Sequence, residues 1–241
     1  QHFNFLHDIA ICTDPRSTSP IRRMSKKLPV TTGSITRWWW VRHAHVTSNH
    51  GRLYGSSDVP AEIDAPGTFR ALAGLLPDDA ICVHSSLQRT KQTLDAIVAA
   101  GLSAPEPLVE AGLAEQNFGE WQGQLYADIP TLAAPYHHRF WFTTVDHRPP
   151  GGESYVDLTR RVTDVIERLT RIHSGQNIIA VSHGGPIRAA LGYALGLTPS
   201  DCVGFETENL SVTRLDHEPG PGAGRQWRIR YTNLVPEYCD I

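Results

Sequence analysis

The chain has 241 residues, a formal net charge of −3 and a hydrophobic content of 40%. This length suits one large α/β domain and is short for two. The balanced charge excludes the basic surface that binds nucleic acid. No apolar run approaches the roughly 20 residues that span a bilayer. Four cysteines without CxxC spacing indicate a reducing compartment. We therefore expect a cytoplasmic protein, monomeric or homodimeric, without a nucleic-acid or membrane partner.

The N-terminal segment differs in composition from the rest of the chain. It is rich in turn formers and basic residues, and it lacks the uninterrupted apolar stretch of a signal peptide. The sequence predicts a flexible extension over residues 1–36 and one domain over residues 37–241. Met24 is the only methionine, so we expect translation to begin there, with residues 1–23 lying upstream of the start.

From residue 37 onward, segments with strand and helix patterns alternate. Apolar runs predict strands at 37–42, 80–84, 177–182, 211–216 and 226–232. Apolar residues at helical spacing predict helices at about 85–100, 154–174 and 186–196. Ser85 and Gln88 have the spacing of a capping box, which places the start of the first of these helices at Ser85. The pattern predicts an α/β fold, a three-layer α/β/α sandwich with a mostly parallel central sheet and an antiparallel edge strand.

Two histidines follow apolar strands directly. His43 comes after Arg42, and His183 comes before the glycine Gly184 at the start of a predicted helix. Arg89 lies in the first turn of another helix, from which its side chain can point back to the sheet. The carboxyl ends of parallel strands meet at one edge, where ligands bind in such folds. Two cations beside two imidazoles suit a phosphoryl group better than a neutral substrate.

Phosphoryl transfer also needs a proton donor for the leaving oxygen. Glu115 is a candidate, because it lies in a segment rich in glycine and aromatic residues. Glu110 and Glu120 are close by in the sequence, and spacing alone does not choose among the three carboxylates.

Two other functions fit parts of the same pattern. His43 and His45 are alternate residues after a strand, so both could bind the metal of a metal-dependent hydrolase. This interpretation lacks a third ligand nearby and places Arg42 beside a cation. A non-catalytic protein that binds phosphorylated ligands is the second alternative. Such a protein has no need of a proton donor, so Glu115 argues against it.

Taken together, these segments resemble the histidine phosphatase (phosphoglycerate-mutase-like) superfamily. The similarity runs from residue 37 to about residue 234 and includes six motifs in order. The motifs are Arg42-His43-Ala44 with Asn49, the loop 51–60, the helix start 85–93, the segment 113–123, the turn 150–154 and the stretch 182–185.

The resemblance implies a role for each matching residue. His43 would be the nucleophile that becomes phosphohistidine, Glu115 would exchange the proton, and three residues would hold the phosphoryl oxygens, namely Arg42, Arg89 and His183. Further substrate contacts would come from Asn49, Tyr54, Gly55 and Gly184. The family's chemistry requires neither a metal nor another cofactor.

The resemblance is strongest to the branch of α-ribazole-phosphate phosphatases and general phosphatases, because the long insertions of the mutases are missing. It implies a metal-independent phosphomonoester hydrolase for a small phosphorylated metabolite, with α-ribazole phosphate as one candidate. Phosphoryl transfer of the phosphoglycerate-mutase type is the alternative within the family. The aromatic segment 136–142 could stack on an aromatic leaving group or pack on the domain instead.

Overall fold

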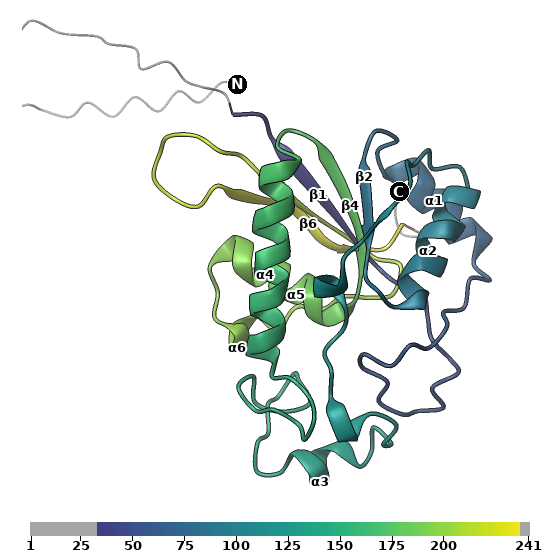
Figure 1. Ribbon diagram of the computed structural model, residues 1–241, viewed down its shortest axis with the longest axis vertical. Coiled ribbons are helices and arrows are strands. Elements are labelled where there is room, and N and C mark those ends of the chain that lie inside the picture. The colour runs from purple at the N-terminus through teal and green to yellow at the C-terminus, as the bar shows by residue number, and fades with distance from the viewer. Residues whose placement is uncertain (1–32, 237–241) are drawn as a thin grey trace, which may run out of the picture. The chain divides into compact units, whose positions relative to one another are not determined.

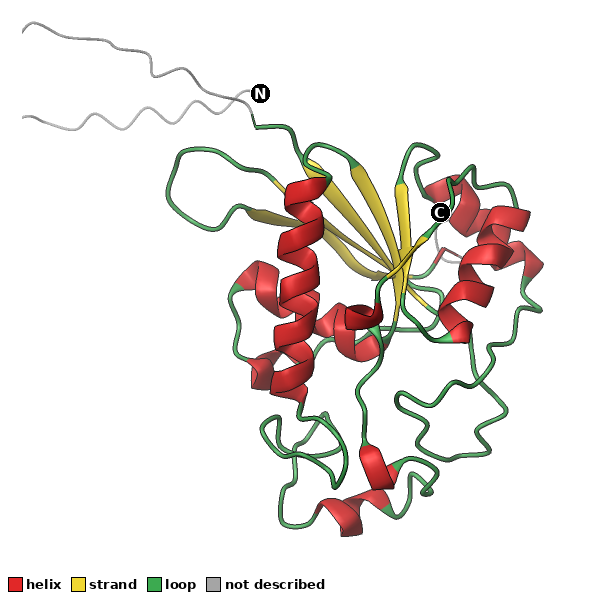
Figure 2. Ribbon diagram, in the orientation of Figure 1, coloured by secondary structure: helices red, strands yellow, loops and turns green. Residues whose placement is uncertain are grey.

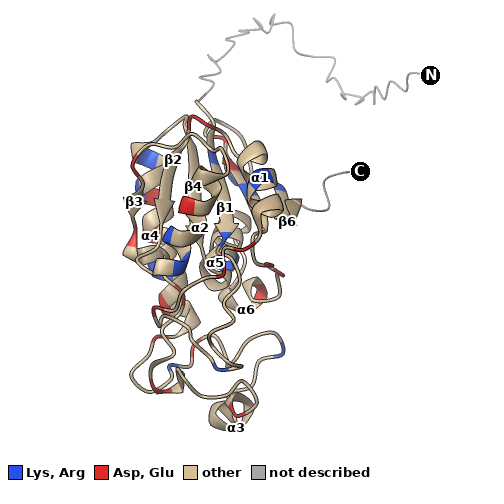
Figure 3. Cartoon of the chain, turned by 90° about the vertical axis from the view of Figure 1, so that its right-hand side faces the viewer, with Lys and Arg blue, Asp and Glu red and all other residues tan. Residues whose placement is uncertain are grey.

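The structure is a computed structural model and describes residues 33–236. The predicted extension over residues 1–36 lies outside the described residues except for its last four, so it stays a prediction. Among the described residues, no helix is long and apolar enough to cross a membrane. Lys and Arg positions are interspersed with Asp and Glu positions along the elements in Figure 3.

A six-stranded sheet forms the centre of the domain. Its strands are β1 (Thr36–Arg42), β2 (Ile81–His84), β3 (Leu108–Val109), β4 (Asn177–Ser182), β5 (Val212–His217) and β6 (Trp227–Leu234). The spatial order is β3-β2-β4-β1-β5-β6. The pairs from β3 to β1 are parallel, whereas β5 pairs antiparallel with both β1 and β6. The predicted fold class is confirmed: the sheet is mostly parallel, and β5 and β6 form an antiparallel pair at one edge.

Strand β1 is apolar throughout because both faces of the sheet are covered. Trp38 and Trp40 belong to a core cluster with α4 (Tyr155–Ile172) and α5 (Gly184–Leu195). Trp39 and Val41 belong to a second cluster with α1 (Pro66–Leu75) and α2 (Gln88–Ala99). Figure 2 shows these helix pairs on either side of the sheet. Successive strand residues point to opposite faces, so a strand between two helical layers needs apolar side chains at every position.

Two predicted helix starts have different outcomes. Helix α4 begins after Ser154, whose side chain forms a capping box with Asp157, close to the predicted start. The capping box predicted for Ser85 and Gln88 is wrong, because α2 begins at Gln88. The hydroxyl of Ser85 is engaged with His183 instead, at 2.8 Å. The carboxylate of Asp58, from a distant loop, accepts the free backbone N–H of Gln88 at 2.7 Å.

A smaller apolar cluster lies beyond the sheet. It is built from buried side chains of three separate segments, Leu53, Phe118, Trp121, Ile129 and Ala133. Helix α3 (Ile129–Ala133) lies below the sheet in Figure 1. The sequence pattern does not predict α3, α1, β3 or the short helix α6 (Pro199–Cys202). Trp141 and Phe142 of the aromatic segment 136–142 pack against this cluster.

Candidate active site

Three neighbouring parallel strands bring the predicted histidines together. Strand β1 ends at Arg42 and is followed by His43, while β4 ends at Ser182 and is followed by His183. Strand β2, on the other side of β4, is followed by Ser85. The ring centroids of His43 and His183 are 5.0 Å apart. The predicted convergence at the carboxyl edge of the sheet is therefore what the structure has.

The imidazole of His43 is buried and electrically neutral near neutral pH. It is 1% exposed. Burial holds the pKa of His43 well below its usual value, and Arg89 and Arg42 lower it further. Nδ1 lies 2.6 Å from the carbonyl oxygen of Ala44, which can only accept a hydrogen bond. The single ring proton is therefore on Nδ1, so Nε2 carries the lone pair that a nucleophile requires.

His183 is held in the opposite tautomer by a chain of hydrogen bonds. Nε of Arg89 donates to Nδ1 of His183 at 3.2 Å, so Nδ1 carries the lone pair. The Nε2 proton is donated to Oγ of Ser85 at 2.8 Å. Ser85 in turn lies 3.0 Å from Oγ1 of Thr90, and Thr90 donates to the carbonyl oxygen of Leu87 at 2.8 Å. Burial, and then the charge of Arg89, hold the pKa of His183 well below its usual value.

Arg89 is fully buried and joins the histidines to the loop that follows β1. Nη2 of Arg89 donates to the carbonyl oxygen of Gly55 at 2.7 Å, and Nη1 donates to that of Ser57 at 2.8 Å. Its guanidinium lies over the ring of Tyr54, 5.1 Å from the centroid. Gly55 has φ +47°, and a Cβ there would stand 2.7 Å from the carbonyl oxygen of Gln116. Only glycine fits this close approach without strain.

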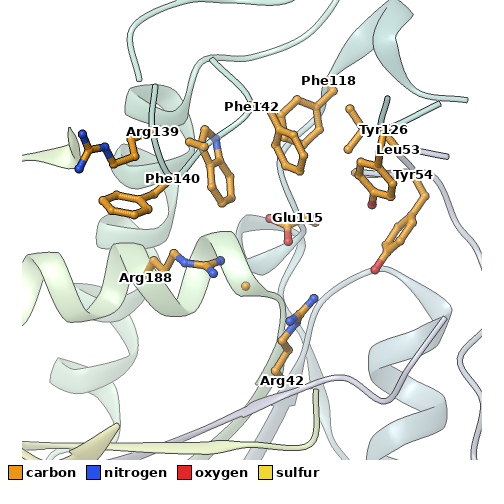
Figure 4. Close-up of a pocket in the computed structure, with 13 residues that line it drawn as sticks. Arg42, Leu53, Tyr54, Glu115, Phe118, Tyr126, Arg139, Phe140, Phe142 and Arg188 are labelled. Carbon is orange, nitrogen blue, oxygen red and sulfur yellow. The ribbon is translucent and has the colours of Figure 1, made fainter. Parts of the chain in front are cut away.

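A cavity of about 450 Å³ opens beside the histidines. Its lining comes from β1, from the loop after it, from the segment around Glu115, from α5 and from the aromatic segment, and includes Arg42, Tyr54, Gly55, Glu115 and Gly184. Neither histidine is part of the lining, but each is the chain neighbour of a lining residue, Arg42 or Gly184. Figure 4 shows Glu115 near the centre of this cavity, with Arg42 pointing toward it.

Glu115 is held in place by backbone groups and by a glycine. Its Oε1 accepts from the backbone N–H of Gln116 at 3.0 Å, and its Oε2 accepts from that of Gly185 at 3.3 Å. A Cβ on Gly185 would overlap Oε1 of Glu115, so position 185 has room only for glycine while the carboxylate stays there. Arg161 of α4 donates to the carbonyl oxygens of Ala114 and Glu115 at 2.7 and 3.2 Å, which fixes the backbone of this segment.

The two competing carboxylates lie elsewhere. Glu110 forms an ion pair with Arg168 at 2.7 Å. Glu120 is exposed, and neither carboxylate lines the cavity. Glu115 is thus the one of the three that a ligand in the cavity would meet.

Of the other predicted substrate contacts, some line the cavity and one does not. Tyr54, Gly55 and Gly184 line the cavity, whereas Asn49 does not, because its Nδ2 donates to the carbonyl oxygen of Arg52 at 2.9 Å. His45 is exposed, unlike the buried His43, so the two imidazoles do not face a common point. Among residues 33–236, no group of three or more His, Cys, Asp or Glu side chains is arranged to hold a metal ion.

The aromatic segment contributes both to the cavity and to packing. Arg139, Phe140, Trp141 and Phe142 line the cavity. Phe140 is 62% exposed, so part of its ring is available to a ligand. Tyr136 instead stacks on His147, with ring centroids 4.1 Å apart. Packing on the domain is thus present in this segment, and stacking on a leaving group stays a prediction.

Three residues of the site were not foreseen. Arg188 lines the cavity one helical turn after Gly184, and this spacing of four residues was the signal that could have found it. Ser85 was interpreted as a helix cap. Thr207 lies in the loop after α6 and holds Arg42 through its carbonyl oxygen, at 2.6 Å. No local pattern indicated Thr207, because only the tertiary fold brings it to the site.

The chain is similar to known proteins in sequence and in fold. Residues 38–230 match the model of the histidine phosphatase superfamily (branch 1). A bifunctional protein of Mycobacterium tuberculosis is 32% identical over 170 residues, which cover 68% of this chain and 45% of that protein. The chain thus spans less than half the length of this relative. The solved structure of mycobacterial hydrolase 2 has a TM-score of 0.70 and 26% identity, covering 84% of this chain and 92% of its own.

Two further relatives are named as phosphatases. A glucosyl-3-phosphoglycerate phosphatase of Mycolicibacterium vanbaalenii is 29% identical over 227 residues, covering 86% of this chain and 98% of its own. An adenosylcobalamin/α-ribazole phosphatase of Salmonella typhimurium is 29% identical over 186 residues, covering 75% and 90%. The predicted family is confirmed: the chain belongs to the histidine phosphatase superfamily, branch 1.

Proposed function

We propose that this protein is a metal-independent phosphomonoester hydrolase that works through a phosphohistidine on His43. The observation that carries the proposal is the buried, neutral ring of His43. Its proton is placed on Nδ1 by the carbonyl oxygen of Ala44. Arg42 and Arg89 lie beside this ring and supply the positive charge that phosphoryl transfer needs.

The first step forms one bond and breaks one. A phosphate monoester enters the inner end of the cavity, and the Nε2 lone pair of His43 forms a bond to phosphorus. The bond between phosphorus and the leaving oxygen breaks, and a protonated Glu115 gives its proton to that oxygen. The guanidinium groups of Arg42 and Arg89 neutralise the charge on the phosphoryl oxygens during transfer.

The second step restores the protein. Glu115, now a carboxylate, takes a proton from a water molecule as the water oxygen attacks phosphorus. The bond between phosphorus and Nε2 of His43 breaks, and inorganic phosphate leaves. The neutral imidazole and the protonated carboxyl are regenerated, so the cycle is balanced without a metal.

The cavity lining favours a small metabolite with an aromatic or nucleoside-like group. Six aromatic side chains line the cavity, Tyr54, Phe118, Tyr126, Phe140, Trp141 and Phe142. Aromatic walls give flat rings a large contact area at modest entropic cost. We take α-ribazole phosphate as a candidate substrate, with support from the similarity to the Salmonella phosphatase.

Trapping of the intermediate tests the mechanism. The protein is mixed with a radiolabelled aryl phosphate and quenched within milliseconds, and the protein-bound label is measured. The label should be stable in base, labile in acid, and absent from His43→Ala. His45→Ala is the matched control, because His45 is the exposed neighbour, and it should keep both label and turnover. Loss of activity on chelation, with recovery on adding zinc or manganese, would instead support the metal-dependent alternative.

Substrate choice is tested by steady-state kinetics on a panel of phosphate esters. Values of kcat/KM for α-ribazole phosphate and nucleoside monophosphates should exceed the value for 3-phosphoglycerate. Efficient interconversion of 3- and 2-phosphoglycerate would establish the mutase alternative in place of hydrolysis.

A further inference from the structure

Three polar side chains converge on Gly184, the first residue of α5. A Cβ placed on Gly184 would stand 2.7 Å from Nη1 of Arg188, 3.2 Å from Oγ1 of Thr207 and 3.7 Å from Nε of Arg42. All three atoms thus lie within 4 Å of one point beside a cavity-lining residue. In Figure 4, the guanidinium groups of Arg42 and Arg188 both lie below Glu115.

Two of these three groups are buried without a partner. Nε of Arg42 and Oγ1 of Thr207 have no hydrogen-bond partner among the described residues. Thr207 is only 4% exposed. An unpaired buried polar group costs about 1–3 kcal/mol. An acceptor that lies between these side chains at the edge of the cavity would satisfy both atoms, so a ligand atom is expected there.

The backbone does not explain the glycine at position 184. Gly184 begins a regular helix, and its φ lies outside the positive range that favours glycine. An alanine would fit the helix and would have better helix propensity. An alanine methyl group would instead collide with the guanidinium of Arg188. The glycine thus lets Arg188 lie close to the start of α5, beside Arg42 and Thr207.

The charge of the cavity lining indicates what kind of ligand atom is expected beside these side chains. Three arginines line the cavity, Arg42, Arg139 and Arg188, and Glu115 is the only carboxylate among the described residues that do so. In the described part of the chain, neither Arg42 nor Arg188 forms an ion pair with a carboxylate. Arg188 donates its Nε–H to the carbonyl oxygen of Phe205 at 2.6 Å and lies over the ring of Trp141. Its Nη1 lies against Gly184, on the same side as Thr207 Oγ1 and Arg42 Nε.

We propose that Arg42, Arg188 and Thr207 form an oxyanion subsite above Gly184 that holds a negatively charged oxygen of the substrate. This inference rests on the proposed hydrolase function and adds Arg188 and Thr207 to the substrate-binding residues. The oxygen belongs either to the transferred phosphoryl group or to a carboxylate elsewhere on the substrate. The two sources share the same chemistry, and the experiment below separates them.

The first measurement is the dissociation constant of inorganic phosphate, obtained by titration calorimetry at constant ionic strength. The variants are Thr207→Val, which removes the hydroxyl and keeps the backbone carbonyl that holds Arg42, and Arg188→Met. Thr207→Ser restores the hydroxyl and should restore binding. Controls are Thr232→Val and Arg171→Met, which change exposed residues away from the cavity. Melting temperatures of all variants show whether each is folded.

The second measurement is kcat/KM for phenyl phosphate and for 3-carboxyphenyl phosphate, which differ by one carboxylate. If the subsite holds a phosphoryl oxygen, Thr207→Val and Arg188→Met weaken phosphate binding about tenfold or more, and both substrates lose kcat/KM. If it holds a substituent carboxylate, phosphate binding is unchanged and only the carboxylated substrate loses kcat/KM.

The subsite would be overturned if Thr207→Val and Arg188→Met bound phosphate as the wild type does and kept the wild-type kcat/KM on both substrates. The phosphate titration needs no turnover, so it still tests the subsite if the protein hydrolyses no phosphate ester. A failure of the proposed hydrolase function is thereby distinguished from a failure of the subsite.

Discussion

The two buried imidazoles make the stability of the protein depend on pH below neutrality. The folded-state pKa values of His43 and His183 are both lowered, burial being the largest cause in each. In the unfolded chain each imidazole has a pKa of about 6.5. Above that pH both states bind no proton at these rings, so stability is unaffected. As pH falls through about 6.5 toward the folded pKa, only the unfolded chain gains protons, and stability is lost.

The size of the loss follows from the number of protons. Each imidazole that stays neutral in the folded state removes about 1.4 kcal/mol per pH unit once its unfolded form is protonated. Between pH 7.5 and pH 5.5, each ring therefore lowers the free energy of unfolding by about 1.4 kcal/mol, and the two together lower it by about 3 kcal/mol. For a domain with a typical stability of about 5–15 kcal/mol, this is a large share.

Urea unfolding at pH 7.5 and 5.5, at one ionic strength, measures this loss. His43→Asn keeps an N–H donor for the carbonyl oxygen of Ala44, and His183→Asn keeps an acceptor for Nε of Arg89. Each variant should lose about 1.4 kcal/mol less than the wild type over this pH interval, whatever its stability at pH 7.5. Equal losses in wild type and variants, within about 0.5 kcal/mol at constant m-value, would refute neutral burial of these rings.

Three more predictions concern the same site. Glu115→Gln should lower kcat on alkyl phosphates by a factor on the order of 10²–10⁴ and less on activated aryl phosphates, with phosphohistidine accumulating on the latter. Quench-flow on both substrate types checks this, and equal losses without trapped intermediate would point to another proton carrier. Gly185→Ala should reproduce that substrate pattern, because its methyl group would displace the Glu115 carboxylate; steady-state kinetics on the same pair decides. Ser85→Ala leaves the Nε2 proton of His183 unpaired and should cost about 1–3 kcal/mol of stability, measured by urea unfolding, whereas an unchanged midpoint would contradict the hydrogen bond between Ser85 and His183.

The parts of the fold that the sequence predicts are those set by local pattern. The run Trp38–Val41 is apolar at every position, which is the pattern of a strand buried on both faces, and the structure has it there. Helix α1 was missed although Phe69 and Leu72 are buried in the second core cluster. Its apolar positions are few and lie among small residues, so the periodicity is weak.

The start of α2 was misplaced for a different reason. Ser85 has the right spacing for a cap, but its hydroxyl bonds His183, which lies 98 residues away. The free N–H of Gln88 is satisfied by Asp58, 30 residues earlier in the chain. A capping rule describes neighbours in sequence, and here the competing partners are neighbours only in space.

The residues of the site divide in the same way, into those set by local pattern and those set by tertiary contacts. Arg42, His43 and His183 stand at strand ends, so the alternation of strands and helices was enough to bring them together. Thr207 is different, because only the tertiary fold brings its hydroxyl close to Arg42 and Arg188. An arrangement of unpaired polar atoms from separate segments has no sequence period. It becomes visible when the hydrogen bonds of every buried polar atom are counted.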